Sequence, residues 1–275
     1  MEIASPFDYA VAASLDVRDI QTRSDQGVVI RNLTFAPSPG VRRAAYVVRP
    51  EGQGPFAAIL YVHWYEPWAL TSNRRQFLAE AKRSAQRGAI SLLVETMWSD
   101  DDWFYKRTQA DDRENSIRQV VELRRGMDLL LMQPGVDARR LAYVGHDFGA
   151  LYGVLMASID PRPACYVLMA GTSRLSDWYL YYPSLEGEAR ESYVRQMEEF
   201  DPITHVSKLA PAPLLFQFGQ DDPHVPQERA QAFYAAADNP KEMRWYAAQH
   251  ELNELATNER EAWLSQRLEL APSYR

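Results

Sequence analysis

The sequence predicts an α/β fold whose central sheet is mostly parallel and is covered by helices on both faces. Short apolar runs of strand length alternate along the chain with longer amphipathic patterns of helical period. The central runs are apolar throughout, which is typical of strands that are buried on both faces of a parallel sheet. No linker, repeat or low-complexity stretch divides the 275 residues, so we expect a single domain over residues 1–275.

The N-terminal elements differ from this pattern. Residues 28–35 and 43–49 are rich in Val, Ile, Tyr and Phe, and the turn-forming stretch 36–40 (APSPG) separates them. This arrangement predicts an antiparallel hairpin at the edge of the sheet. The next run, residues 57–62 (AAILYV), has the length and composition of a buried strand.

The alternation of helix and strand then continues to the C-terminus. Residues 73–87 predict an amphipathic helix, which a Thr71-Ser72 cap begins and Gly88 ends. A further insertion, residues 171–208, is expected to form a short lid. The other elements are expected as strands over 89–94, 140–144, 166–170, 214–218 and 243–247, and as helices over 114–133, 148–159, 227–237 and 252–268.

Composition excludes several classes of protein. Lys and Arg number 30 against 37 Asp and Glu, for a net charge of −7, whereas a nucleic-acid binder needs a concentrated basic face. No apolar run approaches the ~18 residues of a membrane span, and the start lacks the pattern of a signal peptide. The single cysteine, Cys165, fits a reducing compartment. We therefore expect a cytoplasmic protein that binds a small molecule, without nucleic-acid or membrane partners.

One segment has the spacing of a known strand-to-helix turn. A predicted strand runs directly into residues 145–149 (GHDFG), and a helix follows at once. The spacing is that of the nucleophile elbow, G-x-S-x-G, in which the glycines let strand and helix approach closely around an exposed central side chain. Here the central residue is Asp147 instead of serine. A simpler alternative is that Asp147 caps the helix that begins at Phe148.

Two further residues follow later strands in the order that accompanies such an elbow. The strand 214–218 leads to Gly219 and the pair Asp221-Asp222, and the last predicted strand leads to His250. The order nucleophile, acid, histidine is that of the alpha/beta-hydrolase fold. His205 and His224 have no spacing typical of metal ligands, and we expect neither a metal nor a cofactor.

On these residues the chain resembles the alpha/beta-hydrolase superfamily over nearly its whole length, and its layout is similar to the dienelactone-hydrolase-like branch. The resemblance implies the alpha/beta-hydrolase fold and a catalytic triad of Asp147, Asp222 and His250. It favours Asp222 over Asp221, because the acid of that branch has the setting found at residues 219–226 (GQDDPHVP). That branch has serine or cysteine in its elbow. The GHDFG elbow is instead similar to those of epoxide hydrolases and of haloalkane and haloacid dehalogenases.

An aspartate in the elbow changes the expected chemistry. A carboxylate is ionised at neutral pH and needs no base to attack, whereas a serine does. Attack on a carbonyl gives a high-energy anhydride, but attack on a saturated carbon gives an ordinary ester. His250, oriented by Asp222, would then activate the water that hydrolyses this ester. We expect the backbone N–H groups of Phe148 and Trp64 to form the oxyanion hole.

The leaving group also needs assistance, by a tyrosine for an epoxide oxygen or by tryptophan N–H groups for a halide. Aromatic residues are frequent in the loops that follow the predicted strands, Tyr105 among them, and they predict an apolar pocket with a few donors. Tyr179, Tyr181 and Tyr182 in the lid are the candidates for the acid. His63 is expected in a supporting role. The predicted pocket residues are His63, Tyr65, Trp68, Trp98, Trp103, Trp178, Tyr179, Tyr181 and Tyr182.

The first functional hypothesis is therefore epoxide hydrolysis through an alkyl ester of Asp147. Dehalogenation of haloalkanes or haloacids is the nearest alternative. A second alternative is esterase or lactonase chemistry, in which His250 activates water and Asp147 only positions it. A third is a hydrolase fold that binds a ligand without turnover. Neither the substrate nor an oligomeric state follows from these residues.

Overall fold

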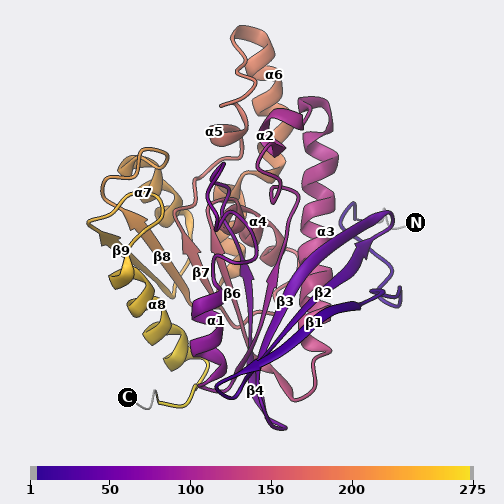
Figure 1. The fold of residues 1–275 in the computed structure, drawn as a ribbon. Coiled ribbons are helices and arrows are strands. Elements are labelled where there is room, and N and C mark those ends of the chain that lie inside the picture. The colour runs from indigo at the N-terminus through magenta and orange to yellow at the C-terminus, as the bar shows by residue number, and fades with distance from the viewer. Residues whose placement is uncertain (1–4, 273–275) are drawn as a thin grey trace.

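The computed structural model describes residues 5–272, and within them nine strands form one sheet in the order β1-β2-β3-β5-β4-β6-β7-β8-β9 (Figure 1). The first three strands are antiparallel, and β3 also pairs antiparallel with β5. From β5 to β9 all neighbours are parallel. The strands are β1 (Arg18–Asp25), β2 (Val28–Ser38), β3 (Val41–Pro50), β4 (Phe56–Val62), β5 (Ala89–Val94), β6 (Val136–His146), β7 (Cys165–Met169), β8 (Leu214–Gly219) and β9 (Lys241–Tyr246).

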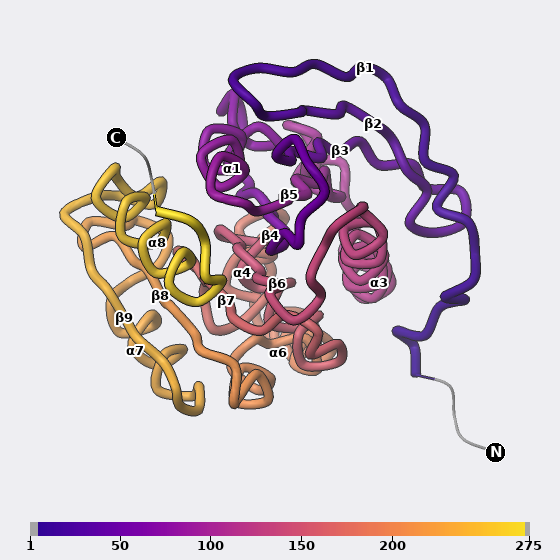
Figure 2. The backbone as a smooth tube through the Cα atoms, turned by 90° about the horizontal axis from the view of Figure 1, so that it is seen from below, coloured from indigo at the N-terminus to yellow at the C-terminus, as the bar shows by residue number. Residues whose placement is uncertain are grey.

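Helices cover both faces of the sheet, as the sequence predicts. Figure 2 shows α1 and α8 on one side and α3 and α7 on the other. Strands β4, β5, β7 and β8 are buried along their whole length. Their sequences are apolar apart from Ser91 in β5 and Gln217 in β8, and both of these side chains are buried as well. The helices are α1 (Leu78–Ala85), α2 (Trp103–Lys106), α3 (Asp112–Leu131), α4 (Phe148–Ala157), α5 (Ser176–Tyr179), α6 (Gly187–Met197), α7 (Gln227–Ala236) and α8 (Glu254–Arg267).

The order of the strands creates a crevice at one end of the sheet. From β4 the chain passes through α1 to β5 on one side, whereas from β6 it passes through α4 to β7 on the other. Ligands of open α/β sheets bind outside the carboxyl ends of strands at such a reversal. The loops after β4 and β6 meet at this point.

Two N-terminal predictions need correction. The predicted hairpin forms β2 and β3, but β1 pairs outside it and is the true edge. Every residue of β1 is exposed, so its sequence RDIQTRSD has no apolar face to reveal it. The helix predicted over 73–87 begins only at Leu78 and has no side-chain cap, because residues 71–77 form turns. Gly88, with a φ of 92°, does follow this helix in the left-handed conformation.

The insertion between β7 and β8, residues 171–208, is called the lid segment here. It contains α5, α6 and three short 3-10 turns, which the sequence did not suggest. Figure 1 shows α5 and α6 standing beside α2 at the top of the molecule. Within residues 5–272, no helix is long and apolar enough to cross a bilayer. The prediction that the chain has no signal peptide depends on its first residues, and residues 1–4 lie outside the described part.

Candidate active site

Asp147 occupies a strained turn between β6 and α4. Its φ of 57° and ψ of −119° lie in a region that costs a non-glycine residue about 1–3 kcal/mol. The turn requires the two flanking glycines. A Cβ on Gly145 would lie 2.3 Å from the Gly149 carbonyl oxygen, and one on Gly149 would lie 2.3 Å from the Val62 carbonyl oxygen. This is the close approach of strand and helix that the elbow spacing predicts.

The Asp147 side chain does not cap α4. It accepts no hydrogen bond from the first turn of the helix; only its backbone oxygen accepts the N–H groups of Ala150 and Leu151. Its Oδ2 instead accepts the backbone N–H of Tyr65, at 2.7 Å, from the loop after β4. The capping interpretation is therefore wrong, and the carboxylate is directed across the crevice between β4 and β6.

His250 lies between two carboxylates. Its Nδ1 is 2.8 Å from Asp222 Oδ2, and its Nε2 is 3.7 Å from Asp147 Oδ1. The other Asp222 oxygen accepts the backbone N–H groups of His224 and Val225 at 2.7 and 3.1 Å. The structure thus brings Asp147, Asp222 and His250 together at the carboxyl ends of β6, β8 and β9. Asp222, and not Asp221, contacts the histidine.

The two carboxylates determine the charge of this histidine. Burial on its own lowers the pKa of His250, but the hydrogen bond to Asp222 and the negative charges of Asp147 and Asp222 outweigh burial and raise the pKa to about 10. Burial raises the pKa of Asp222, but His250 and the two loop amides outweigh it, so this pKa lies below its ordinary value. At neutral pH the free protein therefore has an imidazolium between two carboxylates.

The oxyanion-hole prediction needs a correction at Trp64. The Trp64 backbone N–H donates to Gln76 Oε1 at 2.9 Å, so it is not free for a substrate oxygen. The N–H of the next residue, Tyr65, is the one that reaches Asp147. The Phe148 N–H lies in the first turn of α4, where backbone donors have no acceptor within the helix. Tyr65 therefore replaces Trp64 beside Phe148 as a candidate donor.

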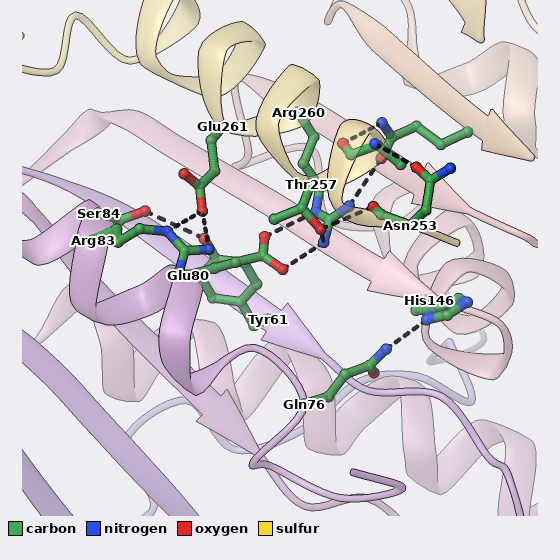
Figure 3. Close-up of polar contacts among 12 residues, drawn as sticks. Tyr61, Gln76, Glu80, Arg83, Ser84, His146, Asn253, Thr257, Arg260 and Glu261 are labelled. Atoms are coloured by element: carbon green, nitrogen blue, oxygen red, sulfur yellow. Dashed lines mark hydrogen bonds and ion pairs between the residues drawn. The ribbon is translucent and has the colours of Figure 1, made fainter. Parts of the chain in front are cut away.

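Gln76 belongs to a partly buried chain of hydrogen bonds beneath the site. Its Nε2 donates to His146 Nδ1 at 2.5 Å, as Figure 3 shows. His146 Nε2 in turn donates to the backbone oxygen of His250 at 2.9 Å. Burial lowers the pKa of His146 well below its usual range, so the ring is neutral, with one donor and one acceptor nitrogen. The chain joins the loop after β4, the elbow and the histidine loop.

A pocket of about 300 Å³ opens above Asp147 and His250. Among the predicted pocket residues, Tyr65, Trp178 and Tyr181 line it. The Tyr65 hydroxyl donates to the Asp101 backbone oxygen, whereas Tyr181 lines the pocket from the lid segment. The full set of lining residues is Tyr65, Glu66, Pro67, Phe104, Tyr105, Asp147, Phe148, Trp178, Tyr181, His224 and His250.

The other predicted pocket residues do not line it. Some pack in the interior, where their polar atoms contact other protein groups: the indole of Trp98 donates to the His63 backbone oxygen, and the Tyr179 hydroxyl bonds to that of Tyr152. Others project outward, as does Trp68, which is 73% exposed. The residues buried away from the pocket are His63, Trp98, Trp103 and Tyr179, and the exposed ones are Trp68 and Tyr182.

Sequence reasoning missed Glu66, Pro67, Phe104 and His224 as lining residues. A positional signal existed, because each lies within two residues of a predicted site residue. The sequence analysis considered mainly Trp and Tyr as pocket residues in these loops and therefore did not include these four. Among residues 5–272, no cluster of three or more His, Cys, Asp or Glu side chains could hold a metal ion.

No protein-family model and no curated protein matches the chain. Solved structures do match. The acetyl xylan esterase of a Paenibacillus species superposes with a TM-score of 0.76 at 16% identity, covering 92% of this chain and 89% of its own. Acetyl xylan esterase 1 of a Thermoanaerobacterium species gives 0.72 at 12% identity, covering 95% and 91%. A candidate dienelactone hydrolase of Klebsiella pneumoniae gives 0.62 at 20% identity, covering 87% and 99%.

At such identities the matches establish the fold alone. The chain has the alpha/beta-hydrolase fold: a mostly parallel sheet with helices on both faces and antiparallel N-terminal strands. The similarity to esterases and to the dienelactone hydrolase layout agrees with the resemblance seen in the sequence. The activities named for these neighbours are those of the neighbours and do not extend to this chain.

Proposed function

We propose that the protein is a hydrolase in which Asp147 attacks a saturated carbon and forms an alkyl-ester intermediate. One observation carries the proposal: the Tyr65 N–H donates to Asp147 Oδ2 at 2.7 Å. In a serine hydrolase such an amide binds the carbonyl oxygen of the substrate. Here it binds an oxygen of the nucleophile itself, which suits a mechanism whose oxyanion forms on Asp147.

The first step uses the other carboxylate oxygen. Oδ1 attacks an epoxide carbon, a new C–O bond forms, and the electron pair of the breaking ring bond moves to the epoxide oxygen. That oxygen takes a proton from Tyr181, which is the one lid tyrosine of the three candidates that lines the pocket. Tyr179 is bonded to Tyr152, and Tyr182 lies outside the lining. Tyr181 then recovers its proton from water.

The second step hydrolyses the ester. Alkylation removes the negative charge of Asp147, one of the two carboxylates that raise the pKa of His250. The imidazolium therefore becomes more acidic and releases its proton to solvent. Neutral His250, still oriented by Asp222, accepts a proton from a water that attacks Asp147 Cγ. The oxyanion forms on Oδ2, where the Tyr65 N–H already lies. Its collapse breaks the ester C–O bond, the leaving oxygen takes the proton from His250 to complete the diol, and the Asp147 carboxyl group returns its own proton to His250.

A second candidate substrate, an alkyl halide, is favoured by Trp178. This residue lines the pocket, and its buried indole N–H has no hydrogen-bond partner among the described residues. Leaving a buried donor unpaired costs roughly 1–3 kcal/mol, and a departing halide ion would supply an acceptor. The attack by Asp147 and the ester hydrolysis are the same for both substrates.

Intact mass spectrometry of His250→Gln tests the covalent step. After incubation with an epoxide and chloroalkane mixture, we expect the variant to gain the full mass of an epoxide, or that of an alkyl group from a halide. Alkylation needs no base, whereas loss of general-base help slows hydrolysis by roughly 10²–10⁴-fold, so the adduct accumulates. Peptide mapping should place it on Asp147, and the double variant Asp147→Asn/His250→Gln should stay unmodified.

Heavy-oxygen water provides the decisive control. In a single turnover of the wild type, the product should contain light oxygen from Asp147, with the heavy atom left on the carboxylate. Heavy oxygen in the first product would show direct attack by water and contradict the proposal. Rapid ester hydrolysis that Asp147→Asn leaves unchanged would instead favour the esterase alternative, and binding without turnover of any probe would favour a ligand-binding role.

A further inference from the structure

We infer that the pocket selects substrates that are neutral or carry an ammonium group and rejects those that carry a carboxylate, with Glu66 as the residue that determines this preference. The inference deepens the proposed function and rests on it for the identity of the reacting group. The charge preference itself concerns binding and can be measured without turnover.

The lining of the pocket carries an excess of negative charge. It contains the acidic residues Glu66 and Asp147, and it contains no Lys or Arg. Asp222 adds a third carboxylate directly behind His250, at 2.8 Å from its Nδ1. The imidazolium of His250 balances only one of the three. A substrate carboxylate would therefore enter without a cationic partner.

Three cations on elements that adjoin the lining residues are already paired with other carboxylates. Lys106 Nζ lies 2.7 Å from Asp100 Oδ2 and 3.5 Å from Asp102 Oδ2. The guanidinium of Arg229 is 3.4 Å from Asp177, and that of Arg107 is paired with Asp112 in the interior.

Glu66 itself has a fixed backbone and a free carboxylate. Its N–H donates to Ser72 Oγ at 3.0 Å, which holds this part of the wall in place. No cation lies within ion-pair distance of its carboxylate among residues 5–272. Glu66 is therefore available to a substrate.

The surroundings strengthen this charge effect. Phe104, Phe148 and Trp178 form apolar walls, and charges interact more strongly beside such walls than in open water. A carboxylate on the substrate would face like charges, which binding sites use to reject wrong partners. An ammonium group would be attracted by Glu66 and could also lie over the exposed rings of Tyr105 and Tyr181. Haloacids, which carry a carboxylate, are excluded as substrates on this basis.

Three unreactive probes of similar shape test the inference: phenethylammonium, phenylacetamide and phenylacetate. We expect calorimetric titration of the wild type to rank them in that order, with the ammonium binding about tenfold or more tighter than the carboxylate. Glu66→Gln should reduce this ratio several-fold by weakening the ammonium and improving the carboxylate. Glu188→Gln on α6, which removes an exposed carboxylate of the same charge, should leave the ratio unchanged.

The outcomes separate this inference from the proposed function. Phenylacetate binding as tightly as phenylacetamide, an unchanged ratio in Glu66→Gln, or no binding by either the ammonium or the amide would overturn the charge preference. If the ranking holds while His250→Gln forms no adduct, the proposed function fails and the charge preference stands. Conversely, if the His250→Gln variant is alkylated by a carboxylate-bearing epoxide as fast as by its amide analogue, the charge preference fails and the proposed function stands.

Discussion

At the scale of single residues, the two oxygens of Asp147 have different neighbours. Oδ2 lies against a backbone donor, whereas Oδ1 lies 3.7 Å from His250 Nε2, beyond hydrogen-bond distance. A serine has one oxygen, which would have to serve as nucleophile while the substrate oxygen fills the hole. In the mechanism that we propose, one oxygen of the Asp147 carboxylate occupies the oxyanion hole while the other acts as nucleophile, so the substrate needs no carbonyl group.

Asp147→Asn should abolish turnover and preserve the fold. The amide has nearly the same shape as the carboxylate but is a poor nucleophile, so we expect kcat to fall by at least about 10³-fold. The thermal midpoint should stay close to that of the wild type. The measurement must use freshly prepared protein, because asparagine here can deamidate to aspartate. Wild-type activity in a fresh sample would refute the assignment of the nucleophile.

His250 should make stability depend on pH. Its pKa of about 10 in the folded protein lies above the value of 6.5 for an unperturbed histidine. The folded state thus binds the proton more tightly, and this stabilisation is fully present below pH 6.5 and is lost as the pH rises to about 10. Relative to His250→Gln, the wild type should lose thermal stability between these values. A constant difference across this range would contradict the raised pKa.

At the scale of elements, a buried arginine fixes the part of the lid segment that carries Tyr181. Arg107, just after α2, donates to the backbone oxygens of Tyr179 and Tyr182 on either side of it. The same guanidinium is paired with Asp112 at the start of α3, which also accepts the Tyr193 hydroxyl of α6 at 2.6 Å. These contacts join α2, α3 and the lid segment, the elements that stand together in Figure 1.

Arg107→Met should therefore impair the alkylation step that we propose for Tyr181. We expect alkylation in the His250→Gln background to slow by about tenfold or more, since a displacement near 1 Å can cost about 10² in rate. Hydrolysis of the preformed ester, measured in a single turnover with His250 present, should change little. Arg113→Met, which removes the exposed ion pair with Glu199 of the lid segment, is the matched control. Equal slowing of both steps would indicate a general structural role instead.

The strands that the sequence predicted well are those that are buried on both faces of the sheet. The run at β4 is apolar on both faces, and the runs at β5 and β8 are apolar apart from Ser91 and Gln217, so composition alone identifies them. In β1, Ile20 is the single large apolar residue and is itself exposed. That strand forms through its ladder with β2, an interaction between distant residues that local sequence does not encode.

The candidate site shows the same division. The sequence alone locates Asp147, Asp222 and His250, because each follows the end of a predicted strand in the order typical of the fold. Trp64 and Tyr65 are adjacent and cannot be ranked as donors without knowing that Gln76, 12 residues later, accepts the Trp64 N–H. Trp98 is an aromatic residue in a loop, as Tyr181 is, but its ring packs against Phe148 and Tyr152 in the interior. Packing of this kind depends on the whole fold.

At the scale of the whole molecule, one buried ion pair joins two helices that are far apart in sequence. Arg260 of α8 lies against Glu80 of α1, with Nε to Oε2 at 2.8 Å and Nη2 to Oε1 at 2.5 Å (Figure 3). The loop before α8 carries His250, and the turns before α1 carry Gln76. The ion pair thus connects the helix that follows the His250 loop with the helix that follows Gln76, on one face of the sheet.

This pair should contribute to stability as a unit. Arg260→Met or Glu80→Gln alone leaves a buried charge unpaired, and we expect each to lower the free energy of unfolding by about 3–5 kcal/mol. The double variant should lose clearly less than the sum of the two, because no lone charge remains. Urea unfolding of the four proteins measures this coupling.

The same two helices provide a matched control. Arg83 of α1 pairs with Glu261 of α8 at 2.6 Å, but its side chain is 47% exposed, and Figure 3 shows the pair beside the buried one. Water already solvates Arg83, so Glu261→Gln, which removes its partner, leaves no buried charge unpaired and should cost at most about 1 kcal/mol. Equal losses for Glu261→Gln and Glu80→Gln, which leave an exposed and a buried arginine respectively, would mean that contact between the helices, and not burial of the charge, sets the cost. Strict additivity in the Glu80 and Arg260 cycle would lead to the same conclusion. A large coupling confined to the buried pair would show that the desolvated charges themselves hold α1 and α8 together beneath the site.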